Sequence, residues 1–561
     1  MLQKGALLHQ NGQLDQAQSI YEQVLKVQPR HARALHLLGM LFGQSSDFKR
    51  ALNLLNRAIS LDPNNAAAHI DRGKTLKELG RYDAALASYN KAIALRPDYA
   101  LAYCNRGTVY RAQFNDQAAL DSYDQAIALQ PDYAEAHYNR GVVLEERRQW
   151  DAALASYNHA IAVKPDHAQA HCNRGNVLRE LNLLDAALAS YERALAIRAD
   201  DAPACSNRGN VLRELQQVEA AVASCSQAIA IDPGCIEGHL NRSLALLLSG
   251  DYENGWVEYE WRWKVKHLSG SLARPTLTQP LWVGKESIAG KTILLYAEQG
   301  LGDTLQFCRY VKLVADLGAR LILEVPKPLE NLLADVAGAT MVVGMGNAQP
   351  HHDFRAPLLS LPLAFKTTLS TVPTHIPYLR SNAQKVHFWK QKLGPKTRPR
   401  VGLVWSGGFR ADQPELWSVN NRRNIPLASL APLRDADIEF YSLQKGQPAE
   451  SELSQLTSER WNGPHLIDHT NLLHDFADTA ALIDNLDLVI SVDTSTAHLT
   501  GALGKPVWIL NRFDTCWRWL LERTDSPWYP TATLYRQERI GDWHGVVQRV
   551  RTDLMQFATH G

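Results

Sequence analysis

Small and apolar residues recur in the first half of the chain at intervals of 34 residues. The recurring residues are Gly5, Gly39, Gly73, Gly107, Gly141, Gly175 and Gly209, with Ala17, Ala51, Ala85, Ala119, Ala153, Ala187 and Ala221, and with Pro29, Pro63, Pro97, Pro131, Pro165 and Pro233. Small residues let two antiparallel helices approach closely, and a proline lacks an N–H and ends the second helix. The pattern therefore predicts stacked helix pairs over residues 1–265, with seven repeats and a degenerate eighth in which Ser243 replaces the glycine.

This period and these residues resemble the tetratricopeptide repeat. An aromatic side chain is expected to fill the space between the two helices of most repeats, at Tyr21, Tyr89, Tyr123, Tyr157 and Tyr191. The resemblance implies an α-solenoid in which the first helix of each repeat lines a concave groove.

One polar column follows the first helices, and it consists of Asn105, Asn139, Asn173, Asn207 and Asn241. A carboxamide both donates and accepts hydrogen bonds, so a row of them can hold the backbone of an extended polypeptide. A similar asparagine row occurs in the repeat arm of protein O-GlcNAc transferases. We therefore predict that this column binds an extended polymer, which is the acceptor substrate in a transferase of that kind. Hydrogen bonding between neighbouring repeats is the alternative, and recent duplication also explains near-copies such as DAALASYNKAIAL and DAALASYNHAIAV.

From Lys291 onward, the sequence pattern changes to short apolar runs that alternate with amphipathic stretches, which is typical of a parallel sheet covered by helices. Runs 291–297, 320–326 and 339–345 are predicted strands, with a helix that begins at Asp303. A second series of predicted strands lies at 401–405, 438–444, 487–493 and 505–510, with helices around 428–434, 475–486 and 542–558.

The resulting domain prediction is a solenoid at 1–265, a linker at 266–290 rich in Ser, Pro and Gly, and α/β halves at 291–390 and 398–561. Two Rossmann-like halves joined by a hinge indicate the GT-B arrangement, in which ligands bind at the carboxyl ends of strands. The fold class is therefore an α-solenoid followed by an α/β GT-B domain.

Composition and charge exclude several classes of protein. The chain has 561 residues, is 45% hydrophobic and has a formal net charge of +1, so we expect neither a disordered chain nor a nucleic-acid-binding protein. The seven cysteines form no CxxC pair, and the N-terminus lacks the pattern of a signal peptide. With no apolar run long enough for an integral membrane segment, a cytoplasmic location is expected.

Asp303 is the candidate catalytic residue. It follows the turn that contains Gly300 and Gly302, where a strand ends and a helix begins. A carboxylate at this position suits a general base, although aspartate also fills such positions as an ordinary helix cap.

Two further strand ends carry candidate donor-binding residues. Ser406, Gly407 and Gly408 directly follow a strand, and Arg422 and Arg423 precede the next helix. Glycine amides and guanidinium groups are typical ligands of a diphosphate. The last candidate is the segment Asp493, Thr494, Ser495, Thr496 and His498, which opens a helix whose N-terminal N–H groups favour a phosphate.

The segments GLGD and SVDTSTAHLTGALGKP resemble glycosyltransferase family 9, the ADP-heptose heptosyltransferase type. The resemblance implies an inverting, metal-independent transfer with Asp303 as the base, and with Asp493 and the small residues after it at the donor. The usual lysine beside the donor phosphates is absent, with Arg422 and Arg423 in that region, and a long repeat arm is not typical of that family. The overall layout is similar to that of protein O-GlcNAc transferases.

We therefore expect a glycosyltransferase whose donor is a nucleotide diphosphate-sugar, with no other cofactor and no metal site. Its acceptor is a polypeptide or glycan recruited by the repeat groove. Asp435 and Asp437 spell a DxD motif, but they precede a strand, so we expect them to lie on the surface. The alternative function is a catalytically inactive scaffold that binds other proteins in envelope or surface-structure biogenesis.

Overall fold

The structure is a computed structural model that describes residues 1–265, 278–408, 417–455 and 462–560. Its contacts divide the chain into two compact units, Met1–Ala199 and Asp200–Gly561. The division falls before the last repeats and not at the predicted linker 266–290, of which residues 266–277 lie outside the described residues. The last repeats therefore belong to the same compact unit as the α/β region.

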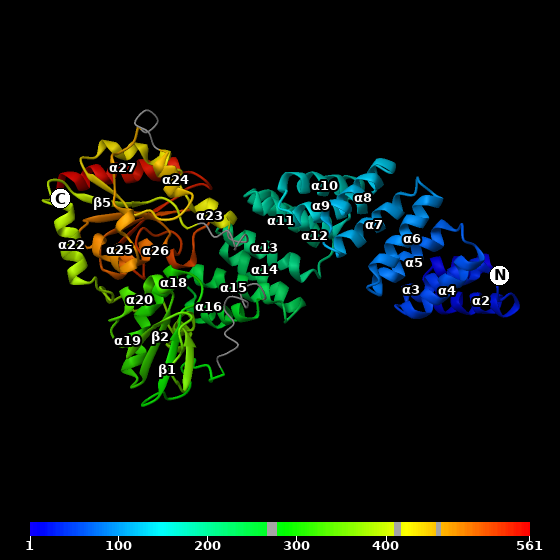
Figure 1. The fold of residues 1–561 in the computed structure, drawn as a ribbon, viewed down its shortest axis with the longest axis horizontal. Coiled ribbons are helices and arrows are strands. Elements are labelled where there is room, and N and C mark those ends of the chain that lie inside the picture. The colour runs from blue at the N-terminus through cyan, green and yellow to red at the C-terminus, as the bar shows by residue number, and fades with distance from the viewer. Residues whose placement is uncertain (266–277, 409–416, 456–461, 561) are drawn as a thin grey trace. The chain divides into compact units, whose positions relative to one another are not determined.

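The first unit is a solenoid of helix pairs, which run from α1 to α12 in Figure 1. The helices are α1 (Leu2–Gln10), α2 (Leu14–Val27), α3 (Ala32–Gln44), α4 (Phe48–Leu61), α5 (Ala66–Glu78), α6 (Tyr82–Leu95), α7 (Ala100–Ala112), α8 (Asp116–Leu129), α9 (Ala134–Glu146), α10 (Trp150–Val163), α11 (Ala168–Glu180) and α12 (Leu184–Ile197). The glycine and tyrosine columns pack against each other, as Gly73 and Tyr89 illustrate. A Cβ at Gly73 would lie 2.5 Å from the Tyr89 ring, so only glycine lets this buried ring fill the space between the helices.

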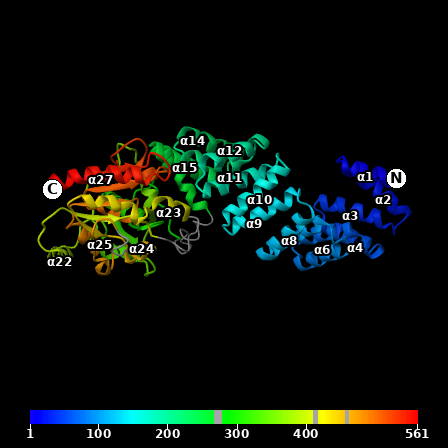
Figure 2. The ribbon, with the colours of Figure 1, turned by 90° about the horizontal axis from the view of Figure 1, so that it is seen from above.

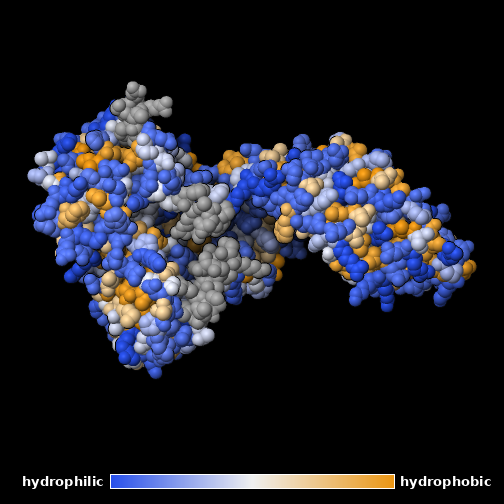
Figure 3. Space-filling view, viewed as in Figure 1, coloured by the Kyte–Doolittle hydropathy of each residue, from blue (hydrophilic) through white to orange (hydrophobic). Residues whose placement is uncertain are grey.

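The turn between the two helices of each repeat uses a left-handed residue with the same 34-residue period. In the first unit these residues are Gly12, Ser46, Gly80, Phe114, Arg148 and Asn182. A side chain other than glycine is strained in this conformation, so the helix pair on either side must enforce it. Phe114 is 92% exposed in this turn. Figure 3 shows the visible surface as mostly hydrophilic, with hydrophobic residues in separate patches.

The second unit opens with the remaining repeats, formed by α13 (Ala202–Glu214), α14 (Val218–Ile231), α15 (Ile236–Ser249), α16 (Tyr252–Tyr259) and the 3-10 helix η1 (Glu260–Lys264). The first α/β sheet follows, in the order β3-β2-β1-β4. Its strands are parallel and comprise β1 (Thr292–Tyr296), β2 (Arg320–Val325), β3 (Met341–Gly344) and β4 (Phe354–Pro357). In its register, Leu294 pairs with Ile322 on β2 and with Arg355 on β4.

The second sheet is also parallel, with the order β10-β9-β8-β5-β6-β7. Its strands are β5 (Arg400–Val404), β6 (Glu439–Ser442), β7 (Leu466–Asp468), β8 (Leu488–Val492), β9 (Val507–Asn511) and β10 (Ala532–Arg536). Its core packs Val401 and Ile490 of the sheet against Val547 and Leu554 of α27 (Trp543–His560). Figures 1 and 2 show α27 and α25 (Phe476–Ile483) on opposite sides of this sheet. The predicted sequence of a solenoid followed by parallel α/β structure is confirmed.

The degenerate eighth repeat is joined to the first sheet by buried polar contacts. Arg262, which is fully buried, donates two hydrogen bonds to Glu298, from Nε to Oε2 at 3.0 Å and from Nη2 to Oε1 at 2.7 Å. Beside this pair, the Gln299 side chain donates to the hydroxyl of Tyr259 at 3.0 Å. The repeat therefore anchors the chain that leaves β1. Within the described ranges, none of the helices combines the length and the apolar composition needed to cross a membrane.

Candidate functional site

The loop after β1 places Asp303 in the first turn of α18 (Leu301–Phe307). Gln299 takes the left-handed conformation, with φ at 61°, and turns the chain into the helix. The helix begins at Leu301 and not at Asp303, and Gly300 is its N-cap, so Asp303 is not the ordinary N-cap weighed as the alternative. From the third helical position, Asp303 Oδ2 accepts a hydrogen bond from the Gly300 N–H at 2.8 Å, the contact of a capping box. The other oxygen, Oδ1, is ion-paired with Arg518.

Arg518 is a residue of this site that sequence reasoning missed. It lies on the 3-10 helix η7 (Trp517–Trp519) after β9, and its side chain is 10% exposed. Its Nε donates to Gln306 Oε1 at 2.6 Å, and its guanidinium lies 4.3 Å from the ring centre of Trp517. The sequence feature that could have indicated this residue is an arginine between two tryptophans, because a guanidinium packs favourably on an aromatic ring.

The turn after β8 places the second candidate segment. Asp493 follows the strand, and Thr494 stands at the N-cap of α26 (Ser495–Ala502), with its hydroxyl 2.9 Å from that of Ser491. His498 is buried in this helix; its Nδ1 lies 2.9 Å from the Tyr529 hydroxyl and its Nε2 lies 3.8 Å from Asp493 Oδ1. Burial lowers the pKa of His498 to about 4, against the opposing effect of Asp493, so the imidazole is neutral at pH 7.

The two loops meet where α18 contacts α26. A Cβ at Gly302 would lie 2.8 Å from His498 Cδ2 and 3.5 Å from the Cα of Ser495. Glycine at this position therefore allows Asp303, from the first sheet, to lie beside the segment that begins at Asp493, from the second. The structure thus brings together two of the three predicted strand ends, which are about 190 residues apart in sequence.

The third strand end joins the same region through Arg423, at the end of α23 (Trp417–Arg423). Its Nη1 donates to the backbone oxygen of Asp493 at 3.0 Å, and its Nη2 donates to Asn420 at 2.6 Å. A Cβ at Gly407 would lie 2.1 Å from Arg423 Nη2, so glycine is required for this close approach.

The predicted role of the Gly407 amide needs correction, because its N–H already donates to Asn424 Oδ1 at 2.8 Å. The Ser406 N–H is likewise bonded, to Gln444 Oε1 at 3.0 Å. Gly408 is exposed and directly precedes residues outside the described ranges. Gly407 therefore acts here by making room for Arg423.

Arg422 also differs from its prediction as a donor ligand. Its Nε donates to Asp514 at 2.9 Å, and its Nη2 lies 3.6 Å from Glu214 of the seventh repeat. Both carboxylates are buried, so the charge of Arg422 is neutralised within the protein. Of the two predicted arginines, Arg423 alone contacts Asp493 among the described interactions.

The asparagine column is half-buried and takes part in hydrogen bonds within the solenoid. Asn139 donates to Cys104 Sγ at 3.8 Å and Asn241 to Ser206 Oγ at 3.0 Å, and each partner lies 35 residues earlier, in the preceding repeat. Asn173 donates to the hydroxyl of Tyr157 at 3.3 Å. The inter-repeat bonding weighed as the alternative is therefore present, and in Asn139, Asn173 and Asn241 these bonds use the side-chain nitrogen and not the oxygen.

Asn105 and Asn207 complete the column. The side-chain nitrogen of Asn105 is buried, with no hydrogen-bond acceptor among the described residues, and Asn207 is half-buried on α13. The arginine that follows each asparagine joins the two helices of its own repeat; Arg106, for example, donates to Ser122 at 3.2 Å. The invariance of these arginines thus has a structural cause.

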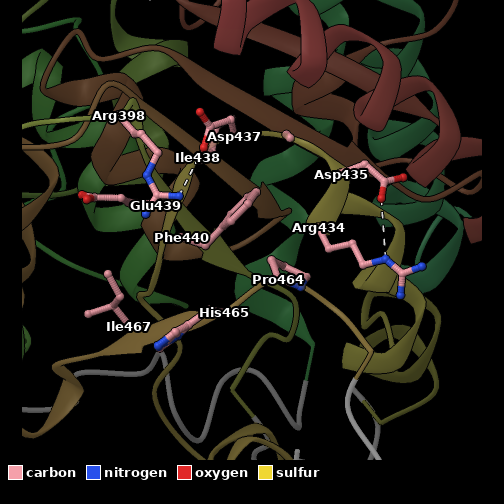
Figure 4. Close-up of a pocket in the computed structure, with 11 residues that line it drawn as sticks. Arg398, Arg434, Asp435, Asp437, Ile438, Glu439, Phe440, Pro464, His465 and Ile467 are labelled. Carbon is pink, nitrogen blue, oxygen red and sulfur yellow. Dashed lines mark hydrogen bonds and ion pairs between the residues drawn. The ribbon is translucent and has the colours of Figure 1, made fainter.

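A pocket of about 540 Å³ lies at the opposite edge of the second sheet, where β6 begins (Figure 4). Arg398 and Asp437 face each other there at 3.2 Å, and Asp435 pairs with Arg434 at 3.6 Å and with Arg551 at 2.7 Å. The DxD carboxylates are therefore neutralised by arginines. Within the described ranges, we find no cluster of three His, Cys, Asp or Glu side chains placed to hold a metal ion.

Comparisons with known proteins identify the repeats. Models described as TPR repeat or tetratricopeptide repeat match residues 1–64, 54–87, 73–113, 109–147, 146–182, 168–201 and 202–235. Tetratricopeptide repeats are therefore confirmed in the N-terminal part of the chain. The resemblance of the α/β region to glycosyltransferase family 9 stays a prediction.

One curated relative is protein FlbA of Caulobacter vibrioides, which is 29% identical over 343 residues, or 56% of this chain. The chain spans about half the length of that relative, since the match covers 54% of it.

Three solved structures are similar over part of the chain. The APC/C hetero-tetramer Cut9–Hcn1 is 21% identical, with a TM-score of 0.39, over 43% of this chain and 48% of that one. MamA is 29% identical, with a TM-score of 0.27, over 29% of this chain and 95% of that one. YrrB, described as a TPR protein with an unusual peptide-binding site, is 25% identical, with a TM-score of 0.29, over 33% of this chain and 95% of that one.

Proposed function

We propose that the chain is an inverting, metal-independent glycosyltransferase of the GT-B arrangement, which transfers a sugar from a nucleotide diphosphate-sugar. The observation that carries the proposal is the contact of Gly302 with His498 and Ser495. Through it, a carboxylate from the first sheet lies beside a helix N-terminus of the second. A base on one side and an anion-favouring helix end on the other are what a sugar transfer from a diphosphate requires.

In this proposal, Asp303 takes the proton of the acceptor hydroxyl as that oxygen attacks the anomeric carbon. The bond from the anomeric carbon to the diphosphate breaks, and the leaving group carries the negative charge. Arg423 and the N–H groups at Thr494, Ser495 and Thr496 stabilise that charge. A neutral His498 supports the turn through Tyr529 and adds no charge of its own.

The repeat arm recruits the acceptor, a polypeptide or a glycan. Tetratricopeptide solenoids present a row of similar positions at a fixed spacing, which suits an extended chain. The asparagine oxygens in the column accept hydrogen bonds from the N–H groups of such a chain without reading its side chains.

A protein-binding scaffold without turnover is the second candidate. It is favoured by the state of the site, in which both oxygens of Asp303 and the Gly407 N–H are already bonded within the protein. Binding of a nucleotide diphosphate-sugar and its slow hydrolysis separate the two candidates, because a scaffold that has lost the donor site shows neither.

The first experiment is a thermal-shift screen of the full chain against ADP, GDP, UDP, CDP and TDP and their common sugars. A donor at about 100 times its dissociation constant stabilises the folded state by roughly 2.7 kcal/mol. We expect the nucleotides of one base to raise the melting temperature more than the others do. If none of these compounds raises the melting temperature, the donor site is wrong and the scaffold function is favoured.

We expect Gly407→Ala to weaken binding of the selected nucleotide about tenfold or more, because the new Cβ displaces Arg423 from the backbone of Asp493. Gly43→Ala in the repeat arm is the control, since a Cβ there comes no closer than 3.9 Å to another described atom. Titration calorimetry measures both. Equal affinities for the two variants would show that Arg423 does not contact the donor.

We expect replacement of Asn139, Asn173 and Asn207 together by Ala to weaken acceptor binding and to leave nucleotide affinity unchanged, since the change lies in the arm. Each lost hydrogen bond costs roughly 0.5–1.5 kcal/mol. The control replaces Asn90 and Asn158, which lie on the second helices α6 and α10 and accept hydrogen bonds from Arg106 and Arg174. Equal loss of acceptor binding in the control, or loss of helicity by circular dichroism in the triple variant alone, would favour a purely structural role.

A further inference from the structure

The ion pair between Asp303 and Arg518 connects the two sheets at the centre of the candidate site. Asp303 belongs to the loop after β1, whereas Arg518 lies 215 residues later, after β9. Both side chains are largely buried, at 18% and 10% exposure. Because burial removes water from both charges, each charge must be compensated by the other or by a ligand of opposite charge.

The guanidinium of Arg518 is fixed by contacts that do not involve Asp303. Its Nε donates to Gln306, its Nη1 lies 3.1 Å from Cys516 Sγ, and the Trp517 ring covers one face. The Nη2 group alone is bonded to the Asp303 carboxylate among the described contacts. Exchange of Asp303 for another anion therefore leaves the rest of the arginine in place.

The carboxylate, in contrast, is not ready to act as a base. One oxygen accepts the Gly300 N–H and the other accepts a charged donor, so an incoming hydroxyl has to compete with a guanidinium for the same oxygen. The N-terminus of α26, where the proposed function places the diphosphate, lies next to this pair, since Gly302 contacts both Ser495 and His498.

We propose that Arg518 is a latch that exchanges Asp303 for the diphosphate of the bound donor, so that the base becomes available only after the donor binds. This inference rests on the proposed function. Arg518 then serves twice, because it holds Asp303 in the empty site and binds the leaving group in the loaded one. Its planar guanidinium suits both tasks, as it matches carboxylate and phosphate geometry equally well.

The latch predicts opposite effects of its two partners on diphosphate binding. Asp303→Asn releases Arg518 and tightens the binding of a nucleoside diphosphate, whereas Arg518→Gln weakens it about 10- to 100-fold, the value of one charge-assisted hydrogen bond. The diphosphate affinity of Arg518→Lys is expected to lie between those of the wild type and Arg518→Gln. In the double variant, Asp303→Asn no longer tightens binding.

Calorimetry with ADP, GDP, UDP, CDP and inorganic pyrophosphate measures these effects on the full chain, with the matching nucleosides in parallel. Nucleoside affinity is expected to be equal in all variants, because the exchange concerns phosphate alone. Arg523→Gln is the matched control, since Arg523 pairs with Asp525 on the surface of the same segment. It is expected to bind as the wild type does.

If a diphosphate binds the wild type and Asp303→Asn leaves the affinity unchanged or lowers it, the latch is overturned while the donor site stands. If no diphosphate binds the wild type, the proposed function fails, and the latch fails with it. Should Arg518→Gln fail to fold, the comparison of Asp303→Asn with the wild type still tests the latch, because that variant leaves the arginine in place and its amide oxygen can accept from the Gly300 N–H.

Discussion

Asp303→Asn is expected to reduce sugar transfer by roughly 10²-fold or more while the protein stays folded. The amide oxygen still accepts the hydrogen bond from the Gly300 N–H, so the variant keeps the cap, whereas the NH2 group that replaces Oδ1 cannot accept from Arg518. An amide takes up no proton at neutral pH, so base catalysis is lost. Hydrolysis of the selected nucleotide-sugar measures the effect before an acceptor is known, since water then replaces the acceptor hydroxyl.

Asp303→Ala is the companion variant, because it removes the cap as well as the base. The two variants are expected to have similarly low turnover, and the alanine variant is expected to melt at a lower temperature. Near-normal turnover of Asp303→Asn would mean that Asp303 is only a helix cap. Circular dichroism and the melting temperature show whether a loss of turnover comes from unfolding.

The repeats were predictable from the sequence because most of them place glycine, alanine and proline at the same three positions, where packing tolerates little else. The left-handed turn column was missed because Phe114 and Arg148 occupy it in place of glycine. The strands β4, β7 and β10 were also missed. The segment FRAP of β4 and the three residues of β7 carry too few apolar positions for a period to show.

The α/β helices show how local chemistry modifies a correct pattern. The stretch around 428–434, predicted to be helical, forms a 3-10 helix, Leu427–Asp435, with Pro432 inside it. A proline removes a backbone N–H and clashes with the preceding turn, which disfavours a regular α-helix.

Strand ends located the candidate site because the carboxyl ends of parallel strands share one edge of a sheet. Their partners were not predictable, since Arg518 reaches Asp303 from 215 residues away and Glu214 reaches Arg422 from the solenoid. No spacing in the sequence records such contacts. The glycine pair after β5 was recognised, but its cause, the close approach of Arg423 to Gly407, appears only in three dimensions.

Arg262→Met is expected to destabilise the second unit by about 3–5 kcal/mol, because it leaves Glu298 as a buried charge without its partner. Burial already raises the pKa of Glu298 above its ordinary value, against the effect of Arg262. Loss of the arginine raises that pKa further. A carboxyl whose folded pKa is raised stabilises the folded state below its unfolded pKa, and this contribution is lost as pH rises through the folded pKa. The deficit is therefore expected to be larger at pH 8 than at pH 5.

The double variant Arg262→Met/Glu298→Gln separates the buried charge from the loss of packing. It removes both charges and keeps side chains of similar size, so most of the lost stability is expected to return, and the dependence on pH is expected to disappear. Urea unfolding of the full chain at the two pH values measures all three proteins. Arg398→Met is the control, because its pairing with Asp437 lies on the surface, where an ion pair contributes little. If Arg262→Met were no less stable than Arg398→Met, the eighth repeat would not anchor the loop that carries Asp303.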